Sequence, residues 1–143
     1  MARRVPVGGA LILDAQGLVQ LANGDRLART LVRRAGLRNA PVVTAASTLA
    51  EVLRGGPKDS PLHRALTWVT VIPVDQDYGR MAGELLGRNG LSGHRHALDA
   101  LLAAVALTQP RPALLLTSDP DDMAVLTEEP GRPRAERIAV VRI

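Results

Sequence analysis

Four acidic residues could share one site because each stands beside an apolar segment that a folded domain would bury. The first ends an apolar run near the N-terminus, and the second lies among leucine and valine side chains in a segment with helical spacing. The third is the only polar side chain of an apolar helix-like segment, and the fourth closely follows another apolar run. These residues are Asp14, Glu51, Asp99 and Asp119. Together they predict one acidic site assembled from four separate segments.

Carboxylates gathered in one place repel one another and need a cation. Two of them about 5 Å apart, at an effective dielectric constant near ~20, repel by roughly 3 kcal/mol. A few such contacts approach the whole stability of a small domain. Mg²⁺ or Mn²⁺ suits an all-oxygen site. Such an ion lowers the pKa of a bound water and stabilises charge on a phosphodiester, which is the chemistry of metal-dependent nucleases.

Each of the four acids also has a purely structural interpretation. Asp14 could cap the helix that follows it, and Asp119, which precedes a proline, has the pattern of a helix N-cap. Asp99 in the first turn of a helix is favoured by the helix dipole. Glu51 could form a surface ion pair with Arg54. We favour a shared site because all four acids coincide in one alternating pattern.

The elements that must position these acids are strands that alternate with helices. Apolar runs predict strands at 9–13, 41–43, 69–74 and 113–116, and weak alternation predicts an edge strand at 137–143. Helices between the strands imply an α/β fold with a mainly parallel five-stranded sheet, covered on both faces and joined by right-handed crossovers. Ligands bind such sheets at the carboxyl ends of the strands, where we expect the acids to lie.

Three local assignments within the helical segments concern individual residues. Thr44 is expected to cap the helix that follows the second strand. Asp99 is expected in the first turn of its helix, and Trp68 is expected to pack in the core or against a second copy of the chain. The predicted helices cover residues 25–34, 45–53, 62–68, 76–88, 97–107 and 120–126.

Composition narrows the classes of protein to which the chain can belong. Its 143 residues suit one domain over residues 1–143, and without cysteine neither disulfides nor thiolate metal sites can form. The formal charge of +4 rests on arginines and one lysine, Lys58, and suits surface solubility or a polyanionic partner. The basic arm Met1-Ala2-Arg3-Arg4 does not read as a signal peptide, and no segment reads as a membrane span, so we expect a cytoplasmic protein.

Four short motifs in this order resemble those of the PIN-domain nucleases, and among them the VapC-type toxins of bacterial toxin–antitoxin pairs. The motifs are LILD ending at Asp14, STLAEV with Glu51, LDALLAAVAL with Asp99 and LLLTSD with Asp119. The likeness runs through most of the chain. It implies a compact three-layer α/β/α domain that cuts RNA with Mg²⁺ or Mn²⁺. It also implies a homodimer that a small antitoxin inhibits by blocking the acidic site.

The resemblance implies roles for the acidic residues. Asp14, Asp99 and Asp119 match the metal ligands. Glu51 either binds the metal through a water or acts as the base that prepares that water. Asp122 is a further candidate ligand, close after the fourth acid.

Other polar side chains near these motifs have supporting roles on the same interpretation. Thr117 is expected to hold the turn that follows it or a water on the metal. Arg80 and Arg95 are candidates for binding RNA phosphate. His94 and His96 have a spacing that could suit a transition metal, but an all-oxygen site leaves them unnecessary as ligands, and a phosphate contact is favoured.

A different class of function is also compatible with these residues. A non-catalytic PIN-like module would keep the acids for folding and bind a partner protein or RNA without cleavage. Phosphotransfer is disfavoured. Gln16 stands where a haloacid-dehalogenase-type phosphatase needs a second acid, and the lysine that a receiver domain needs near its last strand is absent. Metal-dependent endoribonuclease activity is therefore the leading hypothesis.

Overall fold

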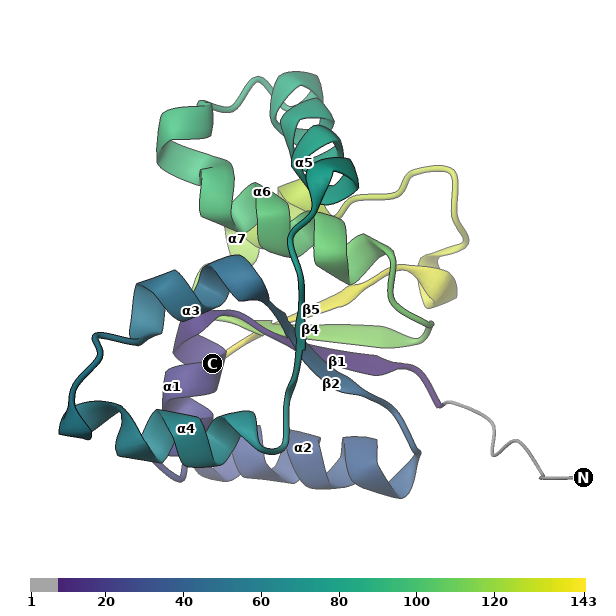
Figure 1. The fold of residues 1–143 in the computed structure, drawn as a ribbon. Coiled ribbons are helices and arrows are strands. Elements are labelled where there is room, and N and C mark those ends of the chain that lie inside the picture. Colours follow the sequence, from purple (N-terminus) through teal and green to yellow (C-terminus); the bar gives the residue numbers. More distant parts are fainter. Residues whose placement is uncertain (1–7) are drawn as a thin grey trace, which may run out of the picture.

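The fold is built on a five-stranded sheet in which every neighbouring pair of strands is parallel (Figure 1). It was analysed in a computed structural model that describes residues 8–143, so the basic N-terminal arm lies outside the described residues. The strand order is β3-β2-β1-β4-β5, which confirms the predicted mainly parallel α/β sheet. The strands are β1 Ala10–Leu13, β2 Val42–Ala45, β3 Thr70–Ile72, β4 Ala113–Thr117 and β5 Ala139–Arg142.

Seven α-helices and two short 3-10 helices connect these strands within residues 8–143. All the predicted helices are present, and the helix that follows the first strand completes the set. The α-helices are α1 Ala15–Ala22, α2 Arg26–Leu37, α3 Ala46–Val52, α4 Ser60–Leu66, α5 Gln76–Arg88, α6 Gly93–Leu107 and α7 Pro120–Leu126. The 3-10 helices are η1 Pro57–Asp59 and η2 Arg134–Glu136.

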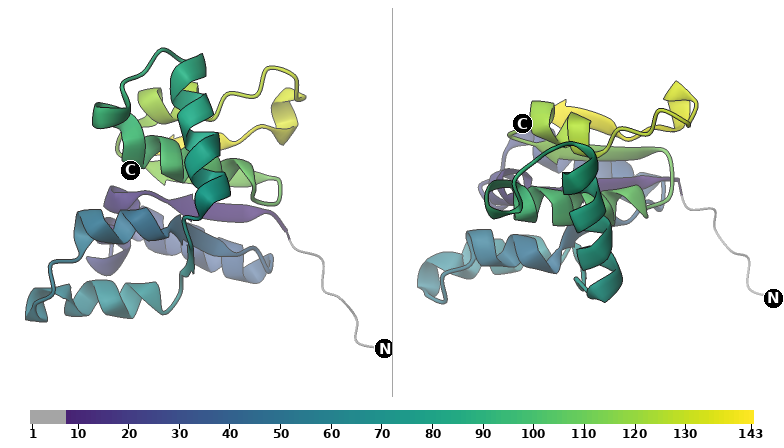
Figure 2. Two further views of the ribbon diagram at one scale, coloured as in Figure 1. Left: turned by 45° about the horizontal axis from the view of Figure 1, so that its top comes forward. Right: turned by 90° about the horizontal axis from the view of Figure 1, so that it is seen from above.

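Helices cover both faces of the sheet and form the three layers expected from the sequence. Alternate residues of β1 point to opposite faces, because side chains alternate along a strand. Ile12 packs with the apolar side chains of α5, α6 and α7, whereas Leu11 and Leu13 pack with those of α1, α2 and α4. Figures 1 and 2 show these two groups of helices on opposite sides of the strands. The prediction of an α/β/α architecture is therefore confirmed.

The strand order reverses at one place along the sheet, and α/β folds form a crevice at the carboxyl edge beside such a reversal. From β1 the chain passes to β2 and β3 on one side, and β4 and β5 lie on the other side. The strand order thus reverses between β1 and β4, and the connections that leave these two strands run in opposite directions. In α/β sheets this reversal is where ligands bind.

Two of the residue-level expectations are wrong, and a third is wrong in one of its two alternatives. Thr44 does not cap α3. It belongs to β2, is fully buried, and donates its hydroxyl to Leu13 O at 2.7 Å. Asp99 is not in the first turn of α6, because this helix begins at Gly93 and already contains His96. Trp68 is not in the core, since 72% of it is exposed, and its packing against a second copy of the chain stays a prediction.

None of the helices between residues 8 and 143 combines the length and the apolar character that a membrane span needs.

Candidate metal centre

Asp14 lies at the crevice between β1 and β4 and is fixed by backbone groups from both sides. Its backbone N–H donates to Leu116 O of β4 at 3.2 Å. Its carboxylate accepts from Gly17 N in α1 at 2.7 Å and from Ser118 N after β4 at 3.0 Å. Asp14 therefore does cap α1, as its structural interpretation proposed, but its second oxygen also ties that cap to the end of β4.

The end of β4 presents a second acid at the same edge. Thr117 is fully buried, and its hydroxyl accepts from Asp119 N at 3.0 Å, so Thr117 holds the turn in which Asp119 lies. Asp119 occupies the N-cap position of α7, yet its side chain makes no capping hydrogen bond. Its carboxylate is thus not engaged by the helix that it precedes.

Asp99 on α6 and Glu51 on α3 face the same crevice from two helices that pack against each other. Burial raises the pKa of Asp99 above its ordinary value of 3.8. The negative charges of Asp119, Asp122 and Asp14 raise it further, and His96 acts in the opposite direction. The pKa responds to all these groups only because they lie close to Asp99.

Glu51 is influenced by the same acids. Partial burial raises the pKa of Glu51 above its ordinary value of 4.5, and the charges of Asp99 and Asp14 add to the rise. The alternative of an ion pair with Arg54 does not hold. The Arg54 guanidinium donates instead to the backbone carbonyls of Ala50, Glu51 and Leu53.

The structure therefore brings the four acids and Asp122 together at one edge of the sheet. Within residues 8–143, the ion pairs of these five carboxylates involve neither arginine nor lysine, and only a histidine lies within 4.0 Å of two of them. Carboxylates that repel one another without a basic partner form the donor set of a hard divalent cation. The chemistry of these donors fits Mg²⁺ or Mn²⁺. Among residues 8–143, the ligand atoms that already lie within 4.8 Å of one another are those of His96, Asp99 and Asp122, and Asp14, Asp119 and Glu51 lie outside this closest group.

His96 is the residue of this cluster whose place the sequence analysis did not foresee. Its Nδ1 lies 4.0 Å from Asp99 Oδ2 and 3.8 Å from Asp122 Oδ2. One ligand atom from each of these three residues lies within 4.8 Å of the others, which is close enough for them to hold one ion. The available signal was the spacing of three residues between His96 and Asp99, which places both on one face of a helix.

The two predicted RNA contacts lie outside this cluster. Arg80 is exposed on α5, and Arg95 is exposed in the first turn of α6. His94 is likewise exposed. None of the three is in an ion pair with the acids, so their role in binding phosphate stays a prediction.

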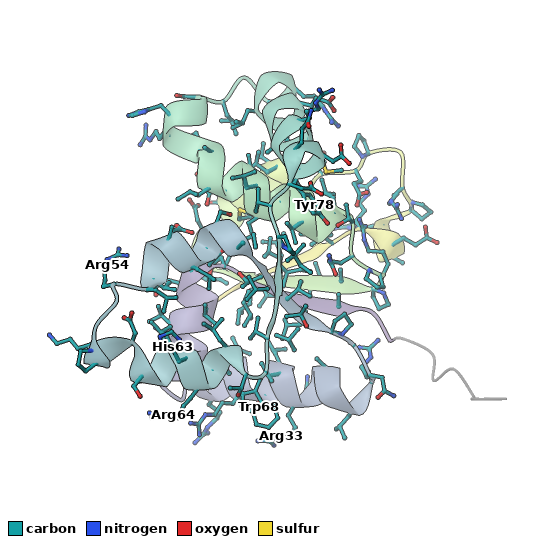
Figure 3. The ribbon with its side chains drawn as sticks, viewed as in Figure 1. Arg33, Arg54, His63, Arg64, Trp68 and Tyr78 are labelled. Atoms are coloured by element: carbon teal, nitrogen blue, oxygen red, sulfur yellow. The ribbon has the colours of Figure 1, made fainter. Side chains whose placement is uncertain are left out.

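A second feature of the surface is an apolar groove of about 490 Å³ between α1, α2 and α4. Its apolar side chains include Leu21, Val32 and the exposed Trp68, and none of the five acids lines it. Arginines border the groove. Figure 3 shows Arg33, Arg64 and Trp68 together on this side of the molecule, and Arg29 lines the same groove.

Comparison with known proteins gives a match in structure only. No protein-family model and no curated protein matches the sequence. Solved structures with a similar fold include VapBC2 from Rickettsia felis bound to a DNA fragment from their promoter. That match has a TM-score of 0.66 and 18% identity, and covers 94% of this chain and 98% of that one. A toxin–antitoxin complex from Klebsiella pneumoniae matches with a TM-score of 0.59 and 24% identity, over 92% and 96% of the two chains. The chain therefore has the PIN fold of VapC-type proteins.

Proposed function

We propose that the protein is a Mg²⁺- or Mn²⁺-dependent endoribonuclease that acts in the cytoplasm. The observation that carries the proposal is the convergence of four acids from β1, α3, α6 and the end of β4 at one crevice. Their charges have no arginine or lysine partner among residues 8–143. The fold is also that of proteins from toxin–antitoxin pairs, which supports a nuclease of the same kind.

In this proposal the acids have two roles, which are to bind the metal ion and to prepare the attacking water. Asp14, Asp99 and Asp119 would hold the divalent ion, with Asp122 as a further ligand. When bound, the ion would stabilise the negative charge that develops on the phosphodiester. Glu51 would either bind the ion through a water or accept a proton from the attacking water as the oxygen of that water bonds to phosphorus and the P–O bond to the leaving oxygen breaks. Glu51 has a raised pKa, and a general base is more effective when its pKa is closer to the working pH.

We expect RNA to be held mainly through its phosphates. The chain has one tryptophan and one tyrosine, so it offers few aromatic surfaces on which bases could stack. Arg80 on α5 and Arg95 at the start of α6 are the proposed phosphate contacts. Arg95 is one residue from His96 and therefore lies beside the acidic cluster along the chain.

Cleavage of total RNA by purified protein tests the proposal directly. With Mn²⁺ present, the parent protein should cut RNA, and a chelator should stop it. Asp99→Asn should abolish cleavage, because the variant loses a ligand charge without losing bulk. Asp121→Asn is the matched control, since Asp121 is exposed on α7 and outside the cluster, and it should retain activity. If Asp99→Asn cut RNA as fast as the parent protein, the assignment would be wrong.

The rival function is a non-catalytic PIN-like module that binds protein or RNA. It predicts neither cleavage nor a rise in melting temperature when millimolar Mn²⁺ is added. A metal site of useful affinity must instead stabilise the folded protein, because an ion that binds only the folded state shifts the unfolding equilibrium. A thermal melt with and without Mn²⁺ therefore separates the two functions before any substrate is known.

We further propose that the protein forms a homodimer and is the toxin of a toxin–antitoxin pair. The two solved structures named above are toxin–antitoxin complexes, and one of them is bound to promoter DNA. The arginine-bordered groove beside Trp68 suits an antitoxin segment that offers apolar side chains flanked by acids. The cheapest check is whether the adjoining reading frame encodes a small protein with a DNA-binding N-terminus and a disordered tail.

A further inference from the structure

The position of His96 is not explained by the four acids alone. Its imidazole is directed at two carboxylates, with Nδ1 at 4.0 Å from Asp99 Oδ2 and at 3.8 Å from Asp122 Oδ2. Both distances exceed the range of a hydrogen bond. The ring therefore stands beside these oxygens without bonding to either, and one ligand atom from each of the three groups lies within 4.8 Å of the others.

The surrounding helices hold the imidazole in this place. His96 and Asp99 are three residues apart on α6, and Asp122 is in the first turn of α7, which packs against α6. Only 16% of the His96 side chain is exposed, compared with 38% for Asp99 and 41% for Asp122. The imidazole is thus the most buried of the three groups.

A phosphate contact, which the sequence favoured for this histidine, does not suit the surroundings. A phosphate oxygen that reached Nδ1 would lie beside the carboxylates of Asp99 and Asp122, and like charges at such distances repel. A cation placed between the three groups is attracted by both carboxylates and can accept the lone pair of an imidazole nitrogen. The geometry is also suitable, because bonds of about 2.1 Å to nitrogen and oxygen keep the ligand atoms of one ion roughly 3–4 Å apart.

We propose that His96 is a nitrogen ligand of the metal centre, acting through Nδ1 beside Asp99 and Asp122, and that it biases the site toward Mn²⁺ over Mg²⁺. The inference rests on the proposed metal centre. The expected bias toward Mn²⁺ follows from the ligand preferences of the two ions. Mg²⁺ prefers oxygen and keeps most of its waters, whereas imidazole suits transition-metal ions. A site with one nitrogen among its oxygens therefore selects between ions that an all-oxygen site would bind similarly.

Pulsed electron paramagnetic resonance of the Mn²⁺-loaded protein tests this inference without reference to activity. The electron spin echo of the parent protein should be modulated by a ¹⁴N nucleus bound directly to Mn²⁺. His96→Gln should lose this modulation, and His94→Gln should keep it, because His94 is exposed two residues away. Asp122→Asn should weaken Mn²⁺ binding but retain the ¹⁴N signal. Circular dichroism and melting temperature establish that each variant is folded.

Competition between the two ions tests the selectivity. Loss of even an outer hydrogen-bond partner costs a metal site at least about tenfold in affinity, so His96→Gln should lose at least that much for Mn²⁺. Its affinity for Mg²⁺ should stay within about threefold of the parent value. If the parent protein binds Mn²⁺ without ¹⁴N coupling, or if His96→Gln weakens both ions equally, the histidine ligand is refuted and the endoribonuclease proposal stands. If the parent protein binds neither ion, both proposals fail.

Discussion

At the scale of single residues, the acidic cluster makes the metal-free protein less stable than its fold alone would allow. Asp99 has a raised pKa because it is partly buried beside Asp119 and Asp122. The free energy of this repulsion is relieved by a cation, by protonation or by removal of one charge. The negative charge of Asp99 therefore lowers the stability of the metal-free protein and, in the proposed site, favours the binding of a metal ion.

Asp99→Asn should accordingly raise the free energy of unfolding of the metal-free protein while it removes cleavage. Because 38% of the side chain is exposed, solvent screens the repulsion, and the gain should be about 0.5–1 kcal/mol. Urea denaturation in the presence of a chelator measures it. Asp121→Asn should leave the free energy of unfolding within error of the parent value. A destabilised Asp99→Asn would mean that the carboxylate makes a favourable contact in the metal-free fold.

The raised pKa values of Glu51 and Asp99 should make the free energy of unfolding depend on pH, with a sign that can be predicted. A carboxyl group with a pKa raised by folding binds more protons in the folded state between its unfolded and folded pKa values. Lowering the pH through that window, above 4.5 for Glu51 and above 3.8 for Asp99, should therefore stabilise the metal-free protein. Asp59 acts oppositely and at lower pH. Hydrogen bonds from Gly55 and Arg54 lower its pKa, so its contribution is lost below 3.8.

Melting temperatures of the chelated protein between neutral pH and about pH 4.5 check this dependence. The double variant Glu51→Gln/Asp99→Asn should lose the stabilisation on acidification, because neither raised pKa remains. A parent protein whose melting temperature falls steadily over the same range, in parallel with the double variant, would contradict the proposed repulsion.

At the scale of elements, the close approach of α1 to β4 positions the first acid. Gly17 in α1 has no side chain where a Cβ would stand 3.1 Å from Leu116 O and 3.4 Å from Asp14 Oδ1. Because Gly17 has no Cβ, α1 can lie close enough to β4 for Gly17 N to donate to the Asp14 carboxylate at 2.7 Å. The packing of one helix thus sets the position of a proposed ligand.

Gly17→Ala and Gly83→Ala form a matched pair that isolates this packing. Alanine within a helix is favoured over glycine by about 0.5–1 kcal/mol, and a Cβ at Gly83 meets nothing within 4 Å. Gly83→Ala should therefore stabilise the protein and leave Mn²⁺ affinity unchanged. Gly17→Ala should gain less or lose stability, because the added methyl group meets Leu116 O of β4 at 3.1 Å. It should also weaken Mn²⁺ binding, because a shift of α1 away from β4 moves Gly17 N, which holds the Asp14 carboxylate. Equal Mn²⁺ affinities in the two variants would contradict this role of α1.

The hydrogen bond between β2 and β1 is a second contact at this scale. Thr44 is fully buried and donates to Leu13 O, immediately before Asp14. Thr44→Val keeps the shape but removes the donor, and should lower the free energy of unfolding by about 1–2 kcal/mol. Thr70→Val on β3, where the threonine is exposed, serves as the control and should be nearly neutral. Chemical denaturation of both variants measures the difference.

At the scale of the whole molecule, the acidic crevice and the apolar groove are separate surfaces. The groove lies among α1, α2 and α4, while the acids lie at the carboxyl edge of the sheet. Trp68 contributes little to the core because it is 72% exposed. We therefore expect a partner that uses the groove to bind independently of the metal ion.

Trp68→Ala should lose affinity for the product of the adjoining reading frame while it retains cleavage, Mn²⁺ affinity and nearly the parent melting temperature. An exposed aromatic anchor can contribute about 2 kcal/mol or more to an interface, so the loss should be at least tenfold by calorimetry. Leu37→Ala, which removes another exposed apolar side chain outside the groove, should bind as the parent does. A second copy of the chain is the other possible occupant of the groove, and light scattering of the parent protein and both variants tests this by measuring their oligomeric state. A dimer of the parent that becomes a monomer in Trp68→Ala would assign the groove to a second copy instead.

The elements and their order follow from local patterns in the amino-acid sequence. Short apolar runs bounded by turn residues are local signals, so the strands and the parallel α/β arrangement could be predicted from them. Asp14 and Asp119 could also be assigned to the edge of the sheet, because Asp14 follows its strand directly and Asp119 lies two residues beyond the end of its strand. The boundaries were less accurate. Helix α6 extends to Gly93, since the packing of its first turns is not visible in a local pattern.

Which side chains meet depends on how the elements pack in three dimensions. Glu51, Asp99 and His96 come from helices whose rotation and contacts depend on packing against the sheet and against each other, and no local pattern encodes these. The same reason explains why Thr44 bonds to β1 instead of capping α3, and why Trp68 lies at a groove instead of in the core. Distances of a few ångströms between residues far apart in the chain are set by the packing of the whole fold.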